Sequence, residues 1–241
     1  MKLRNLHKST KGFTIVELMI ATSVFAFILL VVTFGMLQVG RTYYKGITVS
    51  RTQTAARGII DQISQGIQFS GGPVTTTDGQ DNLDGTTYAF CINNTRFTYV
   101  LGQEVVDGNP VSGLHQTNHG LVVDTVPSNC NSLGPSHNTL TTVTATGLAA
   151  GETELLGPFM RLAKLDVEND PSDPTNHTLY DITIRVVYGD DDLLCSPSGG
   201  DCSDPMATPS PNSADATCKG VIGGQFCAVS ELSTVVEKRR Q

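Results

Sequence analysis

Tryptophan is absent from this sequence, and only 16% of its 241 residues are charged. With 39% hydrophobic residues, a chain of this length supports one apolar segment and one modest globular core rather than two large cores. Small and polar residues crowd the region after Gly71, chiefly Gly, Ser, Thr, Asn, Asp and Pro. That composition is typical of strands joined by long loops. We therefore expect one globular head that is mostly β.

Acidic residues are missing from the start of the chain, where residues 1–12 contain four basic ones. Removing these four charges takes the net charge from −7 to −11. A chain with this net negative charge repels the phosphate backbone of nucleic acids, which disfavours nucleic acid as a partner. A short basic run remains at the C-terminus, Lys238 to Arg240. We expect it to end the last strand in water, with contact to DNA as the alternative.

The sequence signatures of common enzymes are also missing. The chain has no G-x-S-x-G, no H-E-x-x-H and no phosphate-binding P-loop. His115 and His119 have the spacing of a helical metal site, but the surrounding "SGLHQTNHGL" has no helical pattern and no glutamate base. We predict a loop there, and we predict that the protein is not an enzyme.

A long hydrophobic run is present near the N-terminus. Twenty of the twenty-seven residues from Phe13 to Val39 are apolar. With a rise of ~1.5 Å per residue, a helix of this length is about 40 Å long, which is enough to cross a bilayer. The basic residues that precede it place residues 1–12 in the cytoplasm by the positive-inside rule. We predict a single-pass protein of the cytoplasmic membrane with an extracytoplasmic head.

The helix is expected to continue beyond the apolar run. Residues 40–70 repeat apolar side chains at steps of three and four, and the repeat stops at Gly71 to Pro73. Alternation along Leu179–Tyr188 predicts a half-buried strand. The apolar face of this strand must be buried against another element, and we expect that element to be the amphipathic half of the helix. Helix and sheet therefore form one domain.

Further strands are expected in the head, residues 74–241. Residues 86–92 and 95–101 read as a hairpin, because the intervening Asn93 and Asn94 tolerate the positive φ of a tight turn. Residues 159–167 are expected to pair with the 179–188 strand. The remaining segments predicted as strands are 226–239 and, more weakly, 120–126 and 140–146.

Six cysteines follow the apolar run, and none forms a C-x-x-C pair. An even number of cysteines in an exported domain indicates disulfides, and the spacings are poor for zinc. Spacing alone leaves many pairings open. We expect the local pairs Cys195 with Cys202 and Cys218 with Cys227, which leaves Cys91 for Cys130.

Acidic side chains cluster at two places in the head. Asp78, Asp81 and Asp84 lie in the Gly-containing stretch "TDGQDNLDGT", and a second group spans Asp190 to Asp192. Carboxylate oxygens suit calcium, but neither stretch fits an EF-hand loop. We expect solvated turns and no cofactor, with calcium at the first stretch as the alternative.

The stretch "KGFTIVELMIA", from Lys11 to Ala21, resembles the prepilin cleavage and methylation signal of type IV pilins and type II secretion pseudopilins. The resemblance covers the basic leader, Gly12, Phe13, Glu17 and the apolar helix. It implies that a prepilin peptidase cuts between Gly12 and Phe13 and methylates the new Phe13 amine. It also implies the α+β pilin fold, a long N-terminal helix packed on an antiparallel sheet with disulfide-tied loops.

Glu17 is the unusual residue of the apolar run, since neither an ordinary signal anchor nor a secretory peptide accounts for a charge there. In filaments of the family that the segment resembles, this carboxylate pairs with the N-terminal amine of a neighbouring subunit, here that of Phe13. The resemblance therefore implies that Glu17 sets the register of assembly into a cell-surface filament. The implied partners are other pilin or pseudopilin subunits, the prepilin peptidase and an inner-membrane assembly platform.

Two features indicate a minor pilin or pseudopilin rather than a bulk filament subunit. Phe34 stands where many major pilins carry a proline, and the chain beyond Gly12 is longer than that of most major pilins. Glu17 argues against the largest tip subunit of secretion systems, which typically lacks this glutamate. The main alternative is a pilin-anchored head that acts as an adhesin or a DNA-binding module at the fibre tip. A membrane-anchored enzyme is a third hypothesis.

Overall fold

The computed structural model forms two compact units, Met1–Tyr43 and Tyr44–Gln241. The boundary between them falls inside the long helix α1, Ile15–Phe69. The structure describes residues 12–69, 74–75, 81–82, 87–106, 119–125, 148, 151–171, 178–204, 207–220 and 223–239.

In the first unit, α1 is an apolar helix whose side chains are exposed. Every residue from Gly12 to Val39 is exposed. Among the described residues, α1 is the one helix long and apolar enough to cross a membrane. Its Thr and Ser hydroxyls donate hydrogen bonds to backbone carbonyls about one turn earlier. These hydroxyl groups therefore keep a hydrogen-bond partner in an apolar medium. These bonds join Thr22 to Leu18 and Met19, Ser23 to Ile20, Thr33 to Leu29, and Thr42 to Gln38.

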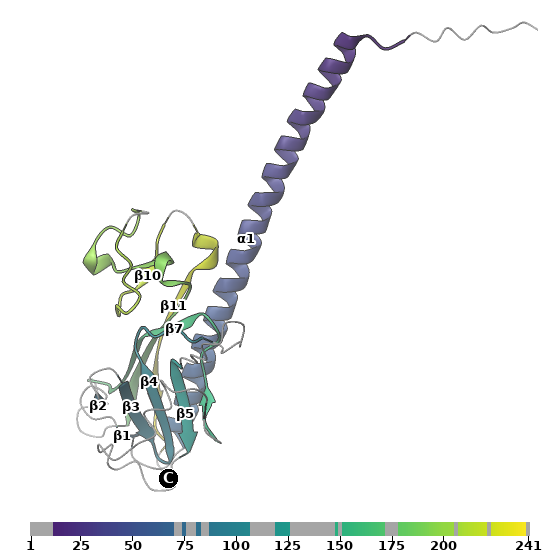
Figure 1. The fold of residues 1–241 in the computed structure, drawn as a ribbon. Coiled ribbons are helices and arrows are strands. Elements are labelled where there is room, and N and C mark those ends of the chain that lie inside the picture. Colours follow the sequence, from purple (N-terminus) through teal and green to yellow (C-terminus); the bar gives the residue numbers. More distant parts are fainter. Residues whose placement is uncertain are drawn as a thin grey trace, which may run out of the picture. The chain divides into compact units, whose positions relative to one another are not determined.

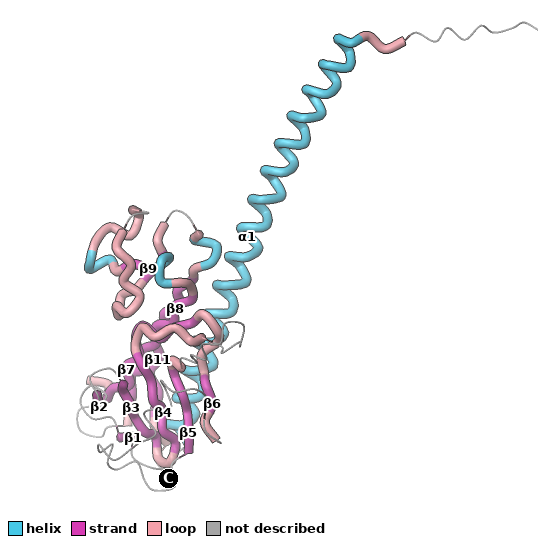
Figure 2. The backbone as a smooth tube through the Cα atoms, viewed as in Figure 1, coloured by secondary structure: helices cyan, strands magenta, loops and turns pink. Residues whose placement is uncertain are grey.

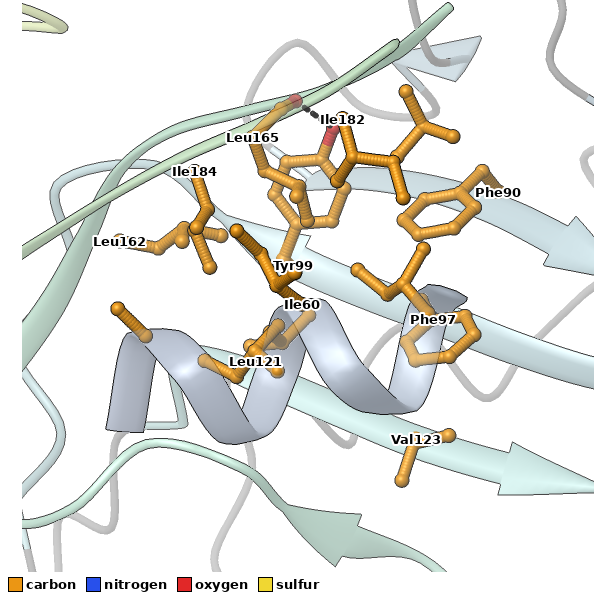
Figure 3. Packing of buried hydrophobic residues seen from close by; sticks show 14 of the residues in the cluster. Ile60, Phe90, Phe97, Tyr99, Leu121, Val123, Leu162, Leu165, Ile182 and Ile184 are labelled. Carbon is orange, nitrogen blue, oxygen red and sulfur yellow. Dashed lines mark hydrogen bonds between the residues drawn. The ribbon is translucent and has the colours of Figure 1, made fainter. Parts of the chain in front are cut away.

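In the second unit, one face of α1 is buried against two sheets (Figure 3). Ala56, Ile59, Ile63 and Ile67 expose at most 1% of their surface, and their spacing puts them on one side of the helix. Gly66 lies beside the sheet, since a Cβ added there would be only 3.3 Å from Cδ1 of Ile92. The helix therefore packs close to the strands through its isoleucine face.

The first sheet is antiparallel, with strand order β1-β3-β4-β5-β6 and β2 paired to β3 (Figures 1 and 2). The predicted hairpin is confirmed by β3 and β4, and Asn93 takes the positive φ of 54° that its turn requires. Phe90 and Phe97 lie opposite each other with ring centres 4.8 Å apart. The strands are β1 Val74–Thr75, β2 Asp81–Asn82, β3 Thr87–Ile92, β4 Thr95–Val100, β5 Leu121–Thr125 and β6 Thr153–Glu154.

The second sheet has the order β11-β8-β7, with β7 at Met160–Asn169, β8 at Leu179–Tyr188 and β11 at Ala228–Glu237. The predicted pairing of residues 159–167 with the 179–188 strand and the predicted last strand are both confirmed. Ile182 and Ile184 join the isoleucines of α1 in one core, as the alternation of β8 predicted. The weaker strand at 120–126 exists as β5, whereas residues 140–146 lie outside the described residues.

The outer face of β8 departs from simple alternation at Val187. Alternation predicts a solvated outer face, but Val187 is fully buried. Leu194, Ala216 and Cys227 cover it, together with Ala163 of β7. The C-terminal loop folds back over this end of the sheet, a contact between distant parts of the chain that strand periodicity does not encode.

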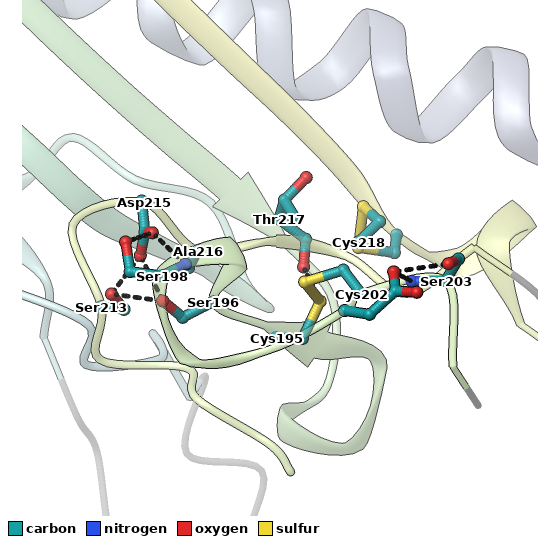
Figure 4. Close-up of a disulfide and its surroundings, with 12 residues drawn as sticks. Cys195, Ser196, Ser198, Cys202, Ser203, Ser213, Asp215, Ala216, Thr217 and Cys218 are labelled. Carbon is teal, nitrogen blue, oxygen red and sulfur yellow. Dashed lines mark hydrogen bonds between the residues drawn. A yellow bond between two sulfur atoms is a disulfide. The ribbon is translucent and has the colours of Figure 1, made fainter. Parts of the chain in front are cut away.

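The C-terminal loop contains the short antiparallel pair β9, Leu194–Cys195, and β10, Thr217–Cys218. The expected local disulfides, Cys195–Cys202 and Cys218–Cys227, are both present (Figure 4). The loop also carries three short 3-10 helices, η2 Asp191–Leu193, η3 Pro197–Gly199 and η4 Gly224–Phe226. Two covalent ties thus hold a segment with few large apolar side chains.

A carboxylate gives the same loop a polar centre (Figure 4). Asp215 accepts hydrogen bonds from the hydroxyls of Ser196, Ser198 and Ser213, and from the backbone N–H of Ser198. The hydroxyls of Ser196, then Ser198 and Ser213, hold the pKa of Asp215 well below its usual range. This carboxylate therefore joins two stretches of the loop that no disulfide connects directly.

A half-buried acid, Glu154, holds β6 against β5. The Glu154 carboxylate accepts bonds from the backbone N–H groups of Gly120, Leu121 and Leu156 at 2.9 to 3.0 Å. The Nδ1 atom of His119 lies 3.4 Å from it, at ion-pair distance but without hydrogen-bond geometry. Burial raises the pKa of Glu154, although the three N–H groups and His119 oppose that shift.

Replacing Ile63 by alanine is expected to destabilise the head. The side chain is fully buried between helix and sheets, so truncation leaves a cavity that costs about 2–5 kcal/mol. Denaturant unfolding of the protein in detergent measures the change. Gln62→Ala, at an exposed position one residue earlier, is the control and should leave the unfolding midpoint almost unchanged. Equal effects from the two variants would contradict the buried face.

Glu154 is expected to make stability depend on pH. Because its pKa is raised in the folded state, its stabilising effect is complete below the unfolded-state pKa and is lost as pH rises through the folded-state pKa. The unfolding free energy of the wild type should therefore fall relative to Glu154→Gln between mildly acidic and neutral pH. Glu168→Gln, at an exposed position, should run parallel to the wild type. A Glu154→Gln curve parallel to the wild type would contradict this assignment.

Candidate functional site

The candidate site is the N-terminal end of α1, where the structure places Gly12, Phe13 and Glu17 within one short stretch. Gly12, Phe13 and Thr14 precede the helix in non-helical conformation. Phe13 exposes 76% of its surface. The bond between Gly12 and Phe13 therefore lies in non-helical, exposed chain next to a helix start, where a peptidase can reach the backbone.

Glu17 takes part in a reciprocal cap of α1 with Thr14. The Thr14 hydroxyl accepts the backbone N–H of Glu17 at 3.3 Å and donates to Oε2 of Glu17 at 2.8 Å. The backbone N–H of Thr14 donates to the same carboxylate oxygen at 2.9 Å. This is a capping box, in which the first and fourth residues of a helix start satisfy each other's free N–H groups.

Thr14 is a residue that the reasoning from sequence missed. Its signal was visible, because "TIVE" has the Ser/Thr-x-x-Glu spacing of a capping box before an apolar run. The cap gives Glu17 a local function in the single chain, where the positive end of the helix dipole also favours a negative charge. Both bonds use Oε2, so Oε1 retains acceptor capacity for a further donor.

The other predicted site residues lie in the head. Cys195, Cys202, Cys218 and Cys227 form the two disulfides of the C-terminal loop. Cys91 is fully buried in β3 and is disulfide-bonded. Cys130 lies outside the described residues, so the pairing of Cys91 with Cys130 stays a prediction.

The calcium hypothesis stays a prediction as well. Asp78 and Asp84 lie outside the described residues. For Asp81, which lies in β2 and pairs with Ala89 of β3, only the backbone is described. Within the described part of the chain, no group of three or more His, Cys, Asp or Glu side chains is close enough to hold a metal ion.

A buried arginine lies beside a pocket of 670 Å³ in the head. Arg161, which is 1% exposed, donates to Asp191 at 2.6 Å and to Glu104 at 2.8 Å. It also donates to the carbonyl of Gly189 at 2.9 Å. Burial raises the pKa of Glu104, against the opposing effect of Arg161. Because both terminal nitrogens are already bound, the arginine ties β7 to two loops and is not available to hold an anion.

The C-terminal basic run is partly engaged with the end of α1. The Arg239 guanidinium lies 5.0 Å from the centre of the Phe69 ring, a cation–π distance. The backbone N–H of Lys238 donates to the carbonyl of Thr178. Arg240 lies outside the described residues. These contacts give Lys238 and Arg239 a structural function at the end of β11.

Comparison with known proteins supports the assignment of the N-terminal site. A family model described as the prokaryotic N-terminal methylation motif matches residues 7–33. No curated protein and no solved structure matches the chain. The match supports a type IV pilin-like prepilin signal, and it covers Gly12, Phe13, Thr14 and Glu17. Together with the apolar helix, the antiparallel sheets and the disulfides, it agrees with the α+β pilin fold expected from the sequence.

Thr14→Ala is expected to loosen the first turn of α1. Removing the hydroxyl deletes both of its bonds with Glu17, so amide hydrogens of the first turn should exchange faster. Hydrogen exchange with mass spectrometry on the detergent-solubilised protein measures this. Thr22→Ala is the matched control, because its hydroxyl bonds only to carbonyls within the helix. Unchanged exchange in Thr14→Ala would contradict the cap.

Proposed function

We propose that this chain is a structural subunit of a type IV pilus or a related filament, a minor pilin or pseudopilin that assembles through its N-terminal helix. The observation that carries the proposal is the exposed apolar stretch from Phe13 to Val39, which is helical from Ile15 on and has a single acid, Glu17, in the first turn of α1. Such a surface is unstable in water, so it needs lipid or the helices of other subunits around it.

The order of events follows from the location of the cut. Prepilin peptidase cleaves between Gly12 and Phe13, removes the basic leader and methylates the new amine of Phe13. The amine and Glu17 then lie about one helical turn apart at the same end of α1. The subunit is held by α1 in the cytoplasmic membrane with the head outside, and an assembly platform moves it into the filament.

Glu17 and the Phe13 amine supply the register of assembly. A carboxylate inside a bundle of apolar helices is tolerated only beside a positive partner. The amine of a neighbouring subunit is that partner when the helices are aligned, whereas a slipped subunit leaves both charges unpaired. The cap with Thr14 uses one carboxylate oxygen, and the other is left for the neighbour.

A second candidate function is display of the head at the fibre tip as an adhesin or a DNA-binding module. The C-terminal loop supports it, because disulfides and the Asp215 centre give a polar loop a fixed shape, and such loops commonly carry binding residues. Binding of the isolated head to cells, glycans or DNA would favour this candidate.

Mass spectrometry of membrane and sheared-filament fractions tests the main proposal. We expect the N-terminal peptide to begin at methylated Phe13 in both fractions. Glu17→Gln should still be cut but should be depleted about tenfold or more from filaments, since it leaves the neighbouring amine unpaired. Asp192→Asn removes one negative charge from an exposed position of the head and should assemble normally. An uncut chain that is absent from all filaments would overturn the proposal.

A further inference from the structure

The pocket of 670 Å³ beside Arg161, named here the Arg161 pocket, has the size of a small-molecule site, for which about 300–1,000 Å³ is usual. Its walls come from separate segments of the second unit. They include Tyr88 of β3, the residues that follow β4, Arg161 of β7, Asp191 of η2 and Asn212 of the C-terminal loop. The fold therefore brings five distant segments of the head together around one space.

A close contact between two of these segments fixes one side of the pocket. Gly102 has a φ of 73°, and a Cβ added to it would lie only 2.3 Å from Cα of Asn212. Only glycine permits this approach. The N–H of Gly102 also donates to the carbonyl of Leu162 at 2.8 Å, which ties the contact to β7. Asn212 is thus held at the pocket by its backbone, while its exposed side-chain amide makes no hydrogen bond with the described residues.

Two carboxylates of the pocket are oriented by the arginine. Arg161 donates to Oε2 of Glu104 and to Oδ1 of Asp191. The second oxygen of each carboxylate makes no hydrogen bond within the described part of the chain, so each keeps acceptor capacity. The Nε atom of Arg161 is buried and also lacks a partner, which is rare in folded proteins. The polar groups of this wall therefore do not satisfy one another completely.

An aromatic ring completes the lining. Tyr88 is half-buried and lines the pocket. Its ring stacks on that of Tyr99, with centres 5.5 Å apart and planes 18° from parallel. Because Tyr99 is fully buried, it supports one face of the Tyr88 ring from the core. A ligand can therefore contact the rest of a ring whose position is already fixed.

The charges of the pocket exclude an anionic ligand. Glu104 and Asp191 line it, Asp190 is exposed beside them, and both terminal nitrogens of Arg161 are already bonded. A hydroxyl group suits the site better, because it both donates and accepts, as the amide of Asn212 does. An ammonium group only donates, so it would leave the N–H groups of that amide without an acceptor.

We propose that the Arg161 pocket binds a neutral saccharide. Sugar hydroxyls donate to the second oxygens of Glu104 and Asp191 and exchange hydrogen bonds with the Asn212 amide, while a C–H face of the sugar packs on Tyr88. Because Arg161 already orients both carboxylates, binding needs little further ordering of side chains. The inference concerns the head alone. It goes beyond filament assembly, and its biological role rests on the second candidate function, display of the head.

Saturation-transfer NMR on the full-length protein, in a zwitterionic detergent without a sugar headgroup, tests the pocket. The probes are glucose, galactose, mannose and N-acetylglucosamine, each in excess. We expect transfer to at least one of them, with a Kd raised about threefold to tenfold by Asn212→Ala and by Asp191→Ala, since each removes hydrogen-bond partners. Asn212→Ala leaves the ion pair of Arg161 intact, which separates loss of binding from loosening of the loops. Asn169→Ala and Asp192→Ala, at exposed positions outside the lining, are the matched controls and should leave the Kd unchanged.

Three results would overturn the saccharide site. The first is no transfer from the wild type to any of the four sugars. The second is transfer that neither pocket variant weakens, because the sugar then binds elsewhere. The third is binding of methylammonium, and of none of the sugars, with the same dependence on Asn212 and Asp191. All three leave filament assembly standing, whereas an uncut chain absent from filaments overturns assembly and leaves the pocket standing.

Discussion

Burial of one face of α1 against two sheets is the contact on which the rest of the head depends. Ala56, Ile59, Ile63 and Ile67 are covered by strands from both sheets, while the part of α1 before Tyr44 belongs to a separate unit and is exposed. A single helix thus has two kinds of surface along its length. The apolar face after Tyr44 is covered by strands of the same chain, whereas the apolar surface before Tyr44 needs lipid or further subunits around it. Folding and assembly therefore use different stretches of the same helix.

Several polar side chains in the apolar parts of the protein have hydrogen-bond partners within the chain. In the exposed half of α1, hydroxyls bond back to helix carbonyls and Glu17 closes the capping box with Thr14. In the head, Arg161 is buried and Glu154 is half-buried, and each binds partners from more than one part of the chain. A buried charge is stable only when its partners are fixed, which makes these residues ties between loops and strands. The C-terminal loop uses disulfides and Asp215 to the same effect, because it has few large apolar side chains.

Much of the fold could be predicted because its signals are local. The hairpin followed from Asn93 and Asn94, the buried face of β8 from its alternation, and the packing of helix on sheet from two apolar faces that each needed a cover. The candidate site was also local, since Gly12, Phe13 and Glu17 lie within six residues of sequence. Thr14 was missed although its spacing to Glu17 was visible, because an apolar run indicates that a helix is present but not the residue at which the helix begins.

By itself, the sequence determined the long apolar helix, the prepilin-type signal, the β-rich head and the two local disulfide pairs, because each depends on neighbours along the chain. Only the tertiary structure decided that Val187 is buried, that Arg161 joins two loops to β7, and that the ring of Phe226 lies beside that of Tyr44. These contacts join residues far apart in the chain. The energy of such a contact depends on the whole packed arrangement, and no periodicity or spacing within one segment carries that information.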